Sequence, residues 1–392
     1  MRRGSFMAAL LLGAACVLPA AAHAAAGPEP LAEEPIPAVT TLPQNWPASW
    51  LLVHDLNFAS ILDGKLAIVD THDTVQPLKG LVRASQFASS QISPANHEIY
   101  TAETFYTRLT RGERTDAITI WDMATLQPKG EIVLPGAKRQ LSVTYRNIFQ
   151  LINHDSWALV ANFTPAQSVT VVDLAGRKLL GEIDLPGCSH IYPTGERGFT
   201  SFCQDGSLIS IQLDAAGKVQ SSKTLPHVQD IDRQPHFQIP AMIGKVAWFV
   251  SYHGQIKGFD LSGPVAAPLP KLASVGTAEG GAPEWRPGGW QVIASDGKNL
   301  LYVLMSPNGK EGSHKDGGTE VWVVDPVAGK RLSRIALGGV FSSIAMTHEA
   351  QPRLVAASAD GLIDIFDPAT GQKIHSLGRT TAANPTLITP VP

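Results

Sequence analysis

Val169-Thr-Val-Val-Asp173 and Val321-Trp-Val-Val-Asp325 are two of seven copies of one pattern, an apolar run that ends in aspartate. β-Branched and aromatic side chains in such a run suit a strand packed on both faces. The terminal aspartates are Asp70, Asp122, Asp173, Asp214, Asp260, Asp325 and Asp367. They lie 41 to 65 residues apart, and a blade of four strands and three turns needs roughly 40 residues. The sequence therefore predicts an all-β fold, a seven-bladed β-propeller.

Two kinds of turn support this interpretation. Each terminal aspartate can accept hydrogen bonds from backbone N–H groups two or three residues ahead, which would hold the turn after the strand. The glycines that follow, Gly176, Gly217, Gly329 and Gly371, are expected to have positive φ. A second kind of turn, a tight hairpin between earlier strands, is predicted at Asp63-Gly64, Asp205-Gly206, Asp296-Gly297 and Asp360-Gly361.

The two ends of the repeat region predict how the ring closes. The first blade has strand candidates only at Trp50 to Asp55, Lys65 to Val69 and Leu78 to Arg83. At the other end, Pro385 to Thr389 lies beyond the seventh blade and has no partner there. An open ring would expose strand edges. We therefore expect this C-terminal strand to become the innermost strand of the first blade.

The N-terminal residues indicate export. Arg2 and Arg3 precede an apolar run from Met7 to Val17, and Ala22-His-Ala24 fits a cleavage site, so residues 1–24 are predicted to be a signal peptide. Lipidation at Cys16 is a weaker alternative. Residues 25–45, rich in Pro, Ala and Glu, are predicted to be a flexible arm, and residues 46–392 the propeller. No later run is long enough to span a membrane.

Charge and cysteine content narrow the function further. The chain has 31 Lys and Arg against 34 Asp and Glu, without a basic face, which argues against a nucleic-acid partner. Once the signal peptide is removed, only Cys188 and Cys203 remain. In an exported chain this pair predicts one disulfide, and two free buried thiols are the alternative.

Three motifs, in order and with matching spacing, carry a resemblance to a known family. They are Thr107 to Asp116 before the strand that ends in Trp121-Asp122, Cys188-Ser-His-Ile-Tyr-Pro193 followed by Cys203-Gln-Asp-Gly206, and Trp285-Arg-Pro-Gly-Gly-Trp290. From about residue 45 to its end, the chain resembles the large subunit of quinoprotein amine dehydrogenases. Residues 308–315, before Glu320-Val-Trp322, look closer to the aromatic amine branch than to the methylamine branch.

The resemblance implies a function and a set of partners. The family's large subunit is a seven-bladed propeller in an H2L2 heterotetramer in the periplasm. The cofactor, tryptophan tryptophylquinone, belongs to a small, disulfide-rich subunit, so this chain would carry no catalytic residue. Primary amines would be oxidised to aldehyde and ammonia, with electrons passing to a blue copper protein of the amicyanin or azurin type. Phe58 matches a family phenylalanine at the mouth of the substrate channel, with an ordinary core position as the alternative.

Other candidate site residues have two interpretations each. Arg108, Arg111 and Arg114 could contact carboxylates of the partner chain or form a solvated loop. Trp285 and Trp290 could form an aromatic interface, or Gly288-Gly289 between them could simply bend the chain. The histidines are scattered without metal-ligand spacing, so no metal site is expected. Two further functions stay open: a stand-alone propeller that acts as a binding module, and a propeller hydrolase of the lactonase type.

Overall fold

The computed structural model describes residues 40–56, 64–270, 273–275 and 284–392. The predicted signal peptide, most of the predicted arm and Phe58 lie outside the described residues. The chain divides into two units, Met1–Thr40 and Thr41–Pro392, and the fold below is that of the second. Within the described part of the chain, none of the helices is long and apolar enough to cross a membrane.

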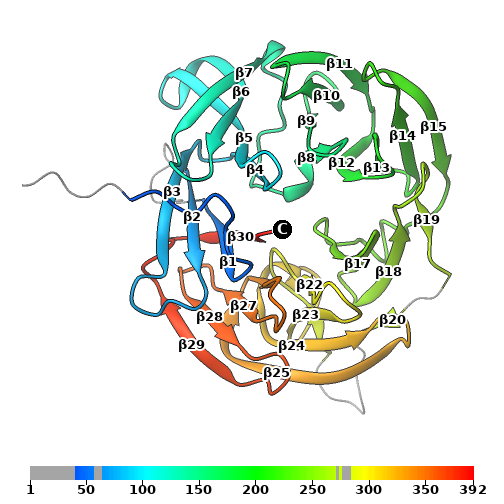
Figure 1. The fold of residues 1–392 in the computed structure, drawn as a ribbon. Helices are drawn as coiled ribbons and strands as arrows, with labels where there is room; N and C mark the ends of the chain where they lie inside the picture. The colour runs from blue at the N-terminus through cyan, green and yellow to red at the C-terminus, as the bar shows by residue number, and fades with distance from the viewer. Residues whose placement is uncertain (1–39, 57–63, 271–272, 276–283) are drawn as a thin grey trace, which may run out of the picture. The chain divides into compact units, whose positions relative to one another are not determined.

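Seven antiparallel sheets form a ring, which confirms the predicted β-propeller (Figure 1). The first sheet consists of β3 (Leu78–Ala84), β2 (Gly64–Asp70), β1 (Trp50–Asp55) and β30 (Pro385–Pro390). The second consists of β4 (Ser89–Ser93), β5 (Glu98–Arg108), β6 (Arg111–Asp122) and β7 (Pro128–Leu134). The third consists of β8 (Phe149–Ile152), β9 (Trp157–Asn162), β10 (Ser168–Asp173) and β11 (Lys178–Asp184). The fourth consists of β12 (Cys188–Pro193), β13 (Gly198–Cys203), β14 (Leu208–Leu213) and β15 (Val219–Leu225).

The remaining three sheets are given from the channel outward, like the second to the fourth, whereas the first was given from its outermost strand inward. The fifth consists of β16 (Ala241–Ile243), β17 (Val246–Val250), β18 (Gln255–Asp260), β19 (Ala267–Pro268) and β20 (Ala273–Ser274). The sixth consists of β21 (Arg286–Pro287), β22 (Ile293–Ser295), β23 (Leu301–Ser306), β24 (Gly318–Asp325) and β25 (Lys330–Phe341). The seventh consists of β26 (Ser343–Met346), β27 (Leu354–Ala357), β28 (Ile363–Phe366) and β29 (Lys373–Gly378). Three short 3-10 helices complete the described elements: η1 (Pro135–Ala137), η2 (Arg146–Ile148) and η3 (Ser313–Lys315).

The C-terminal strand closes the ring, as the sequence predicts. β30 pairs antiparallel with β1, with Leu52 opposite Thr389 and Val53 opposite Ile388. Ile388 is fully buried and packs with the core of the first and seventh sheets. The first and last parts of the propeller are therefore joined within one sheet, which removes the open edge.

All seven repeat aspartates hold their turns as predicted. The Oδ1 atom of each accepts hydrogen bonds from backbone N–H groups two to four residues ahead, at 2.8 to 3.4 Å. Gly217, Gly329 and Gly371 have the expected positive φ. The prediction was wrong for Gly176, because Arg177 has the positive φ (48°) in that turn. Gly176 is needed for space instead, since a Cβ there would lie 2.4 Å from the Asp173 carboxylate.

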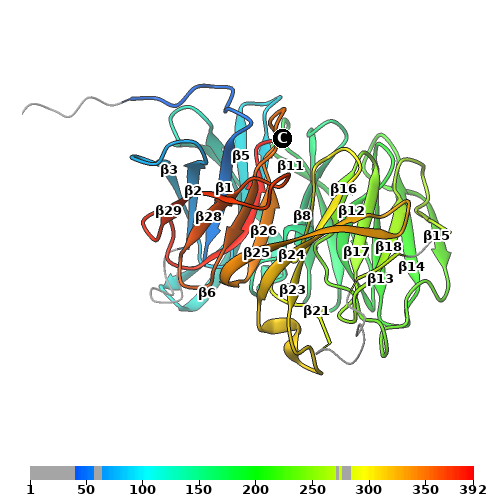
Figure 2. The ribbon, with the colours of Figure 1, turned by 90° about the horizontal axis from the view of Figure 1, so that it is seen from below.

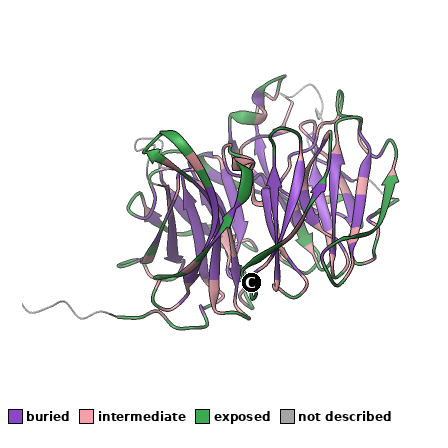
Figure 3. Ribbon diagram, turned by 90° about the horizontal axis from the view of Figure 1, so that it is seen from above, coloured by how far each residue is buried: buried purple, intermediate pink, exposed green. Residues whose placement is uncertain are grey.

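The core lies within and between the sheets. Strands near the channel are mostly buried, whereas outer strands such as β15 are exposed along most of their length (Figure 3). Seen from the side, the strands run between two faces of the ring that carry the loops (Figure 2). Of the predicted arm, the structure describes residues 40–45, where the Leu42 N–H donates to the Ala124 carbonyl at 2.8 Å.

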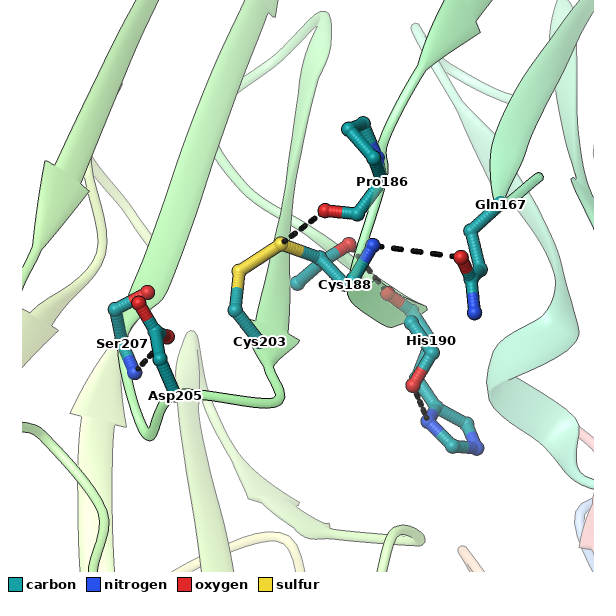
Figure 4. The surroundings of a disulfide bond; sticks show 10 residues. Gln167, Pro186, Cys188, His190, Cys203, Asp205 and Ser207 are labelled. Atoms are coloured by element: carbon teal, nitrogen blue, oxygen red, sulfur yellow. Dashed lines mark hydrogen bonds between the residues drawn. A yellow bond between two sulfur atoms is a disulfide. The ribbon is translucent and has the colours of Figure 1, made fainter.

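Cys188 and Cys203 form the predicted disulfide. Cys188 in β12 lies directly opposite Cys203 in β13, with their Cα atoms 3.9 Å apart (Figure 4). The bond joins the innermost strand of the fourth sheet to its neighbour. It therefore fixes the edge of this sheet that faces the channel, next to His190.

Candidate functional site

The candidate site is a pocket of about 460 Å³ at one end of the central channel, here called the aromatic pocket. Its lining comes from residues that are far apart in the sequence: Leu56, Val143, Tyr145, Phe237, Gln238, Tyr252, Gly289, Trp290, His314, Lys315, Ser342, Ala359, Asn384, Pro385 and Thr386. Many of these residues immediately precede an inner strand or begin one. The pocket therefore lies at the end of the channel where the inner strands start.

Tyr145 and Trp290 close the floor of the pocket from opposite sides of the ring. Tyr145 precedes the third sheet, Trp290 lies between β21 and β22 of the sixth, and their ring centroids are 4.6 Å apart. The indole Nε1–H of Trp290 donates to the Thr144 carbonyl at 3.1 Å. Tyr145 also meets the His190 ring edge-on, with centroids 5.2 Å apart. These contacts span the channel and fix the aromatic floor.

Gly289 explains how the chain brings Trp290 into the channel. Its φ is 135°, which side-chain-bearing residues rarely adopt, and a Cβ there would lie 2.4 Å from the Ser342 carbonyl oxygen. The N–H of Gly289 donates to the His314 carbonyl at 2.9 Å. The bend that was one alternative in the sequence is therefore present, and an aromatic interface with a partner chain stays a prediction.

A second group of rings forms another wall of the pocket. Tyr252 stacks on His314 with centroids 4.1 Å apart and planes 9° apart, and Phe237 lies 4.7 Å from Tyr252. Burial raises the pKa of Tyr145 and that of Tyr252, so both phenols stay neutral. Burial, reinforced by the charge of Lys315, lowers the pKa of His314, so the imidazole is mostly neutral at pH 7. The wall is therefore aromatic and uncharged.

The described lining of the pocket is suited to binding an apolar group. Among its described lining residues there is no aspartate or glutamate, and Lys315 is the one residue with a permanent charge. No group of three or more His, Cys, Asp or Glu residues in the described part of the chain could hold a metal ion. The described lining residues can enclose an apolar group and exclude water, and none of them is a carboxylate that could act as a general base.

The structure brings only one of the two candidate tryptophans into the pocket. Trp285 instead packs on Trp322 of β24, with ring centroids 5.5 Å apart. The Arg334 guanidinium lies over both rings, 4.8 Å from that of Trp285 and 5.1 Å from that of Trp322. Trp285 is thus partly buried against its own blade, and its predicted contact with a partner stays a prediction.

The three candidate arginines lie on the long hairpin of β5 and β6. Arg108 and Arg111 flank its turn and are exposed, and no ion pair is seen for either within the described residues. Arg114 is different, because it forms a salt bridge with Asp116 at 2.9 Å and donates to the Arg139 carbonyl. The turn residue Leu109 is 73% exposed, so the tip presents one apolar side chain between two cations.

Most of the pocket residues could not be found from the sequence. Tyr145, Phe237 and Tyr252 stand in segments without a motif, and only the ring closure brings them together. His314 belongs to residues 308–315, which resemble the family, but this resemblance does not predict that His314 lines a pocket. Phe58 lies outside the described residues, but Leu56, two positions earlier, lines the pocket.

Comparison with known proteins gives a consistent result. A family model described as methylamine dehydrogenase heavy chain matches residues 57–391. The methylamine dehydrogenase heavy chain of Methylorubrum extorquens is 32% identical over 390 residues, which cover 98% of this chain and 92% of that protein. The corresponding protein of Paracoccus versutus is 33% identical over 295 residues, covering 74% of this chain and 67% of that protein. Both relatives are methylamine dehydrogenase heavy chains, and the likeness of residues 308–315 to the aromatic amine branch stays a prediction.

Among solved structures, a dihydro-heme d1 dehydrogenase shares the fold. The two superimpose with a TM-score of 0.52 and 14% identity, over 88% of this chain and 76% of the other. At this identity the similarity concerns the fold alone.

Proposed function

Because the chain belongs to the methylamine dehydrogenase heavy chain family, we propose that it is the large, cofactor-free subunit of a periplasmic amine dehydrogenase. In this proposal it docks a small subunit that carries tryptophan tryptophylquinone, in an H2L2 heterotetramer. The complex oxidises primary amines to aldehyde and ammonia and passes electrons to a blue copper protein. The observation that carries the proposal is 32% identity over nearly the full length of both chains.

The aromatic pocket supports a role for this chain in holding the substrate. The quinone of the partner would supply the redox chemistry, and the pocket fits such a division because its described lining has no carboxylate. Trp290, Tyr145 and Tyr252 would enclose the hydrocarbon part of the amine and exclude water from the reacting groups. Phe58 is proposed as a further wall of the same channel.

The exposed turn of the β5–β6 hairpin is proposed as a contact with the small subunit. Arg108 and Arg111 are free to bind carboxylates of another chain, whereas Arg114 is already engaged with Asp116. An arginine can bind a carboxylate through two parallel hydrogen bonds, which gives such a contact geometric specificity. We therefore expect Arg108→Ala and Arg111→Ala to weaken assembly more than Arg114→Lys.

Purification of the native protein from the periplasm tests the proposal as a whole. We expect a short chain that stains for quinone to co-purify with it, and the complex to reduce a redox dye when a primary amine is added. If the protein runs alone while amine oxidation is found in another fraction, the proposed function is wrong. Parallel assays with methylamine and with an aromatic amine then identify the substrate class.

The role of the pocket is tested in the assembled complex with Trp290→Ala. We expect kcat/KM for the amine to fall at least about tenfold, because a wall of the channel is lost. Phe58→Ala is expected to act in the same direction. The matched control is Phe163→Ala, an aromatic residue that is 56% exposed and does not line the pocket. Equal kinetics for Trp290→Ala and Phe163→Ala, with both complexes intact, would contradict the proposed channel.

A further inference from the structure

A second cavity of about 220 Å³, here called the arginine cavity, lies toward the other end of the channel. Its lining includes Tyr192 and Pro193 at the end of β12 and Gly244 and Lys245 just after β16. Arg146 also lines it, and the preceding residue, Tyr145, lines the aromatic pocket. No described residue lines both cavities, so the arginine cavity does not depend on the proposed amine channel.

The charge of Arg146 is not balanced by the described residues. Its Nη2 donates to the backbone carbonyl of Ile388 at 2.8 Å, and its Nε, which is buried, has no hydrogen-bond partner. No acidic residue is among the described lining residues of the cavity. Burial lowers the pKa of Arg146 to about 10, so the guanidinium still carries its full charge at neutral pH.

The other described residues that line the cavity are positively charged or neutral. Lys245, which is exposed, lines the cavity and adds a second positive charge at its opening. His348 is close enough for the charge of Arg146 to contribute to the lowering of its pKa, which is caused first by burial. Pro193, Met242 and Leu261 supply apolar surface. Arg146 is partly buried, and a charge withdrawn from water without a counter-charge is costly, whereas a bound anion would offset that cost.

We propose that the arginine cavity is a binding site for a small carboxylate anion, held by the guanidinium of Arg146 inside the propeller channel. The guanidinium fork matches a carboxylate better than it matches a spherical ion, because two parallel hydrogen bonds can form. The volume is below the roughly 300–1,000 Å³ of pockets that take drug-sized ligands, which limits the ligand to a few heavy atoms. Lys245 attracts the anion to the opening.

Binding at Arg146 has a consequence for ring closure. The Ile388 carbonyl, to which Arg146 donates, belongs to the closing strand β30 and also accepts from Gln291 Nε2 at 3.0 Å. An anion that holds the guanidinium in place therefore also supports the contact between the third sheet and the closing strand. Ligands that bind only the folded state raise its apparent stability.

The test uses the purified protein, with any chain that co-purifies, in a buffer free of carboxylates. Sodium acetate is titrated at constant ionic strength against sodium chloride, with thermal unfolding and calorimetry as readouts. We expect acetate, more than chloride, to raise the unfolding midpoint. Arg146→Gln should weaken acetate binding at least tenfold, and Lys245→Gln two- to threefold at low salt. Arg233→Gln, at an exposed arginine outside the cavity, is the matched control and should leave binding unchanged.

Two outcomes would overturn the proposal. One is an equal acetate response in the wild type and in Arg146→Gln, which would indicate adventitious ion binding only. The other applies if Arg146→Gln does not fold: crystals of the wild type are then soaked in acetate or in chloride, and the difference density is calculated. Planar density beside the Arg146 guanidinium in acetate alone supports the carboxylate site, and its absence there rejects the site.

Discussion

The turns of the blades and the lining of the channel are held together in different ways. In each turn an aspartate bonds to backbone groups two to four residues ahead, and the same arrangement occurs in all seven blades. In the channel, Gln291 and Arg146 reach Ile388 across 97 and 242 residues of sequence, and Trp290 reaches Thr144 across 146. Turn contacts are local and repeated, whereas each channel contact occurs once and depends on the closed ring.

Gln291 gives the strongest test of this difference, because it bridges three backbone groups. Its Nε2 donates to the carbonyls of Ile344 and Ile388, and its Oε1 accepts from the Ile388 N–H. Gln291→Leu leaves the Ile344 carbonyl and the Ile388 N–H without these partners, each at a cost of about 1–3 kcal/mol, whereas the Ile388 carbonyl keeps its bond from Arg146. We expect the free energy of unfolding to fall by roughly 3 kcal/mol or more in denaturant titrations.

The control for Gln291→Leu is Gln372→Leu, at an exposed glutamine of a blade turn. Surface substitutions of this kind usually change stability by less than about 0.5 kcal/mol. If both variants lose the same amount, the closing strand is held mainly by its pairing with β1, and the channel contacts are less important than we infer.

The disulfide links the channel side of a blade to the rest of that blade, because it joins the innermost strand to the second strand. Cys203→Ser removes a link that closes a loop of 15 residues. The chain-entropy relation gives a loss of about 3 kcal/mol for a loop of this length. The variant Cys188→Ser/Cys203→Ser should lose about the same amount in thermal or denaturant unfolding. A much larger loss in Cys203→Ser alone would point to the unpaired thiol as the cause.

A buried histidine beside the closing strand predicts how stability responds to acid. His54 in β1 is opposite Leu387 of β30 and is 2% exposed. Burial lowers its pKa from 6.5 to about 4, against the opposing charge of Asp55. Because the unfolded chain takes up the proton first, this contribution is complete above pH 6.5 and is lost as the pH falls toward 4. The loss from pH 7 to pH 5 should be about 2 kcal/mol.

Comparing variants separates the contribution of His54 to stability from the contributions of the carboxylates that also titrate in acid. In His54→Leu the decline in stability between pH 7 and pH 5 should be smaller than in the wild type by about 2 kcal/mol. The control is His72→Gln, since His72 is at the surface and pairs with Glu349. An unchanged pH profile in His54→Leu would mean that the imidazole is hydrated in the folded protein.

The difference between the local turn contacts and the long-range channel contacts also explains what the sequence could predict. The seven aspartates, the closing strand and the disulfide were found because each leaves a local or repeated signal in the chain. In the aromatic pocket Trp290 stands in a motif, but Tyr145 and Tyr252 leave no signal, because only the closed ring brings these three residues together. The wrong prediction at Gly176 also came from a local signal, because a glycine after an aspartate suggested a positive φ. In the structure, glycine is required there because a Cβ would lie too close to the Asp173 carboxylate.

Substitutions of the turn aspartates should have the smallest effects on stability, and these effects should be additive. Asp122 accepts from the N–H groups of Ala124 and Thr125, and Asp367 from those of Ala369 and Thr370. Asp122→Ala and Asp367→Ala should each lower the free energy of unfolding by about 1 kcal/mol. Asp122→Asn, which keeps an acceptor oxygen, should lose less. Because the two turns share no partners, the double variant should lose the sum to within about 0.5 kcal/mol. A larger departure from additivity would show that the blades respond as one unit and that their turns are not independent.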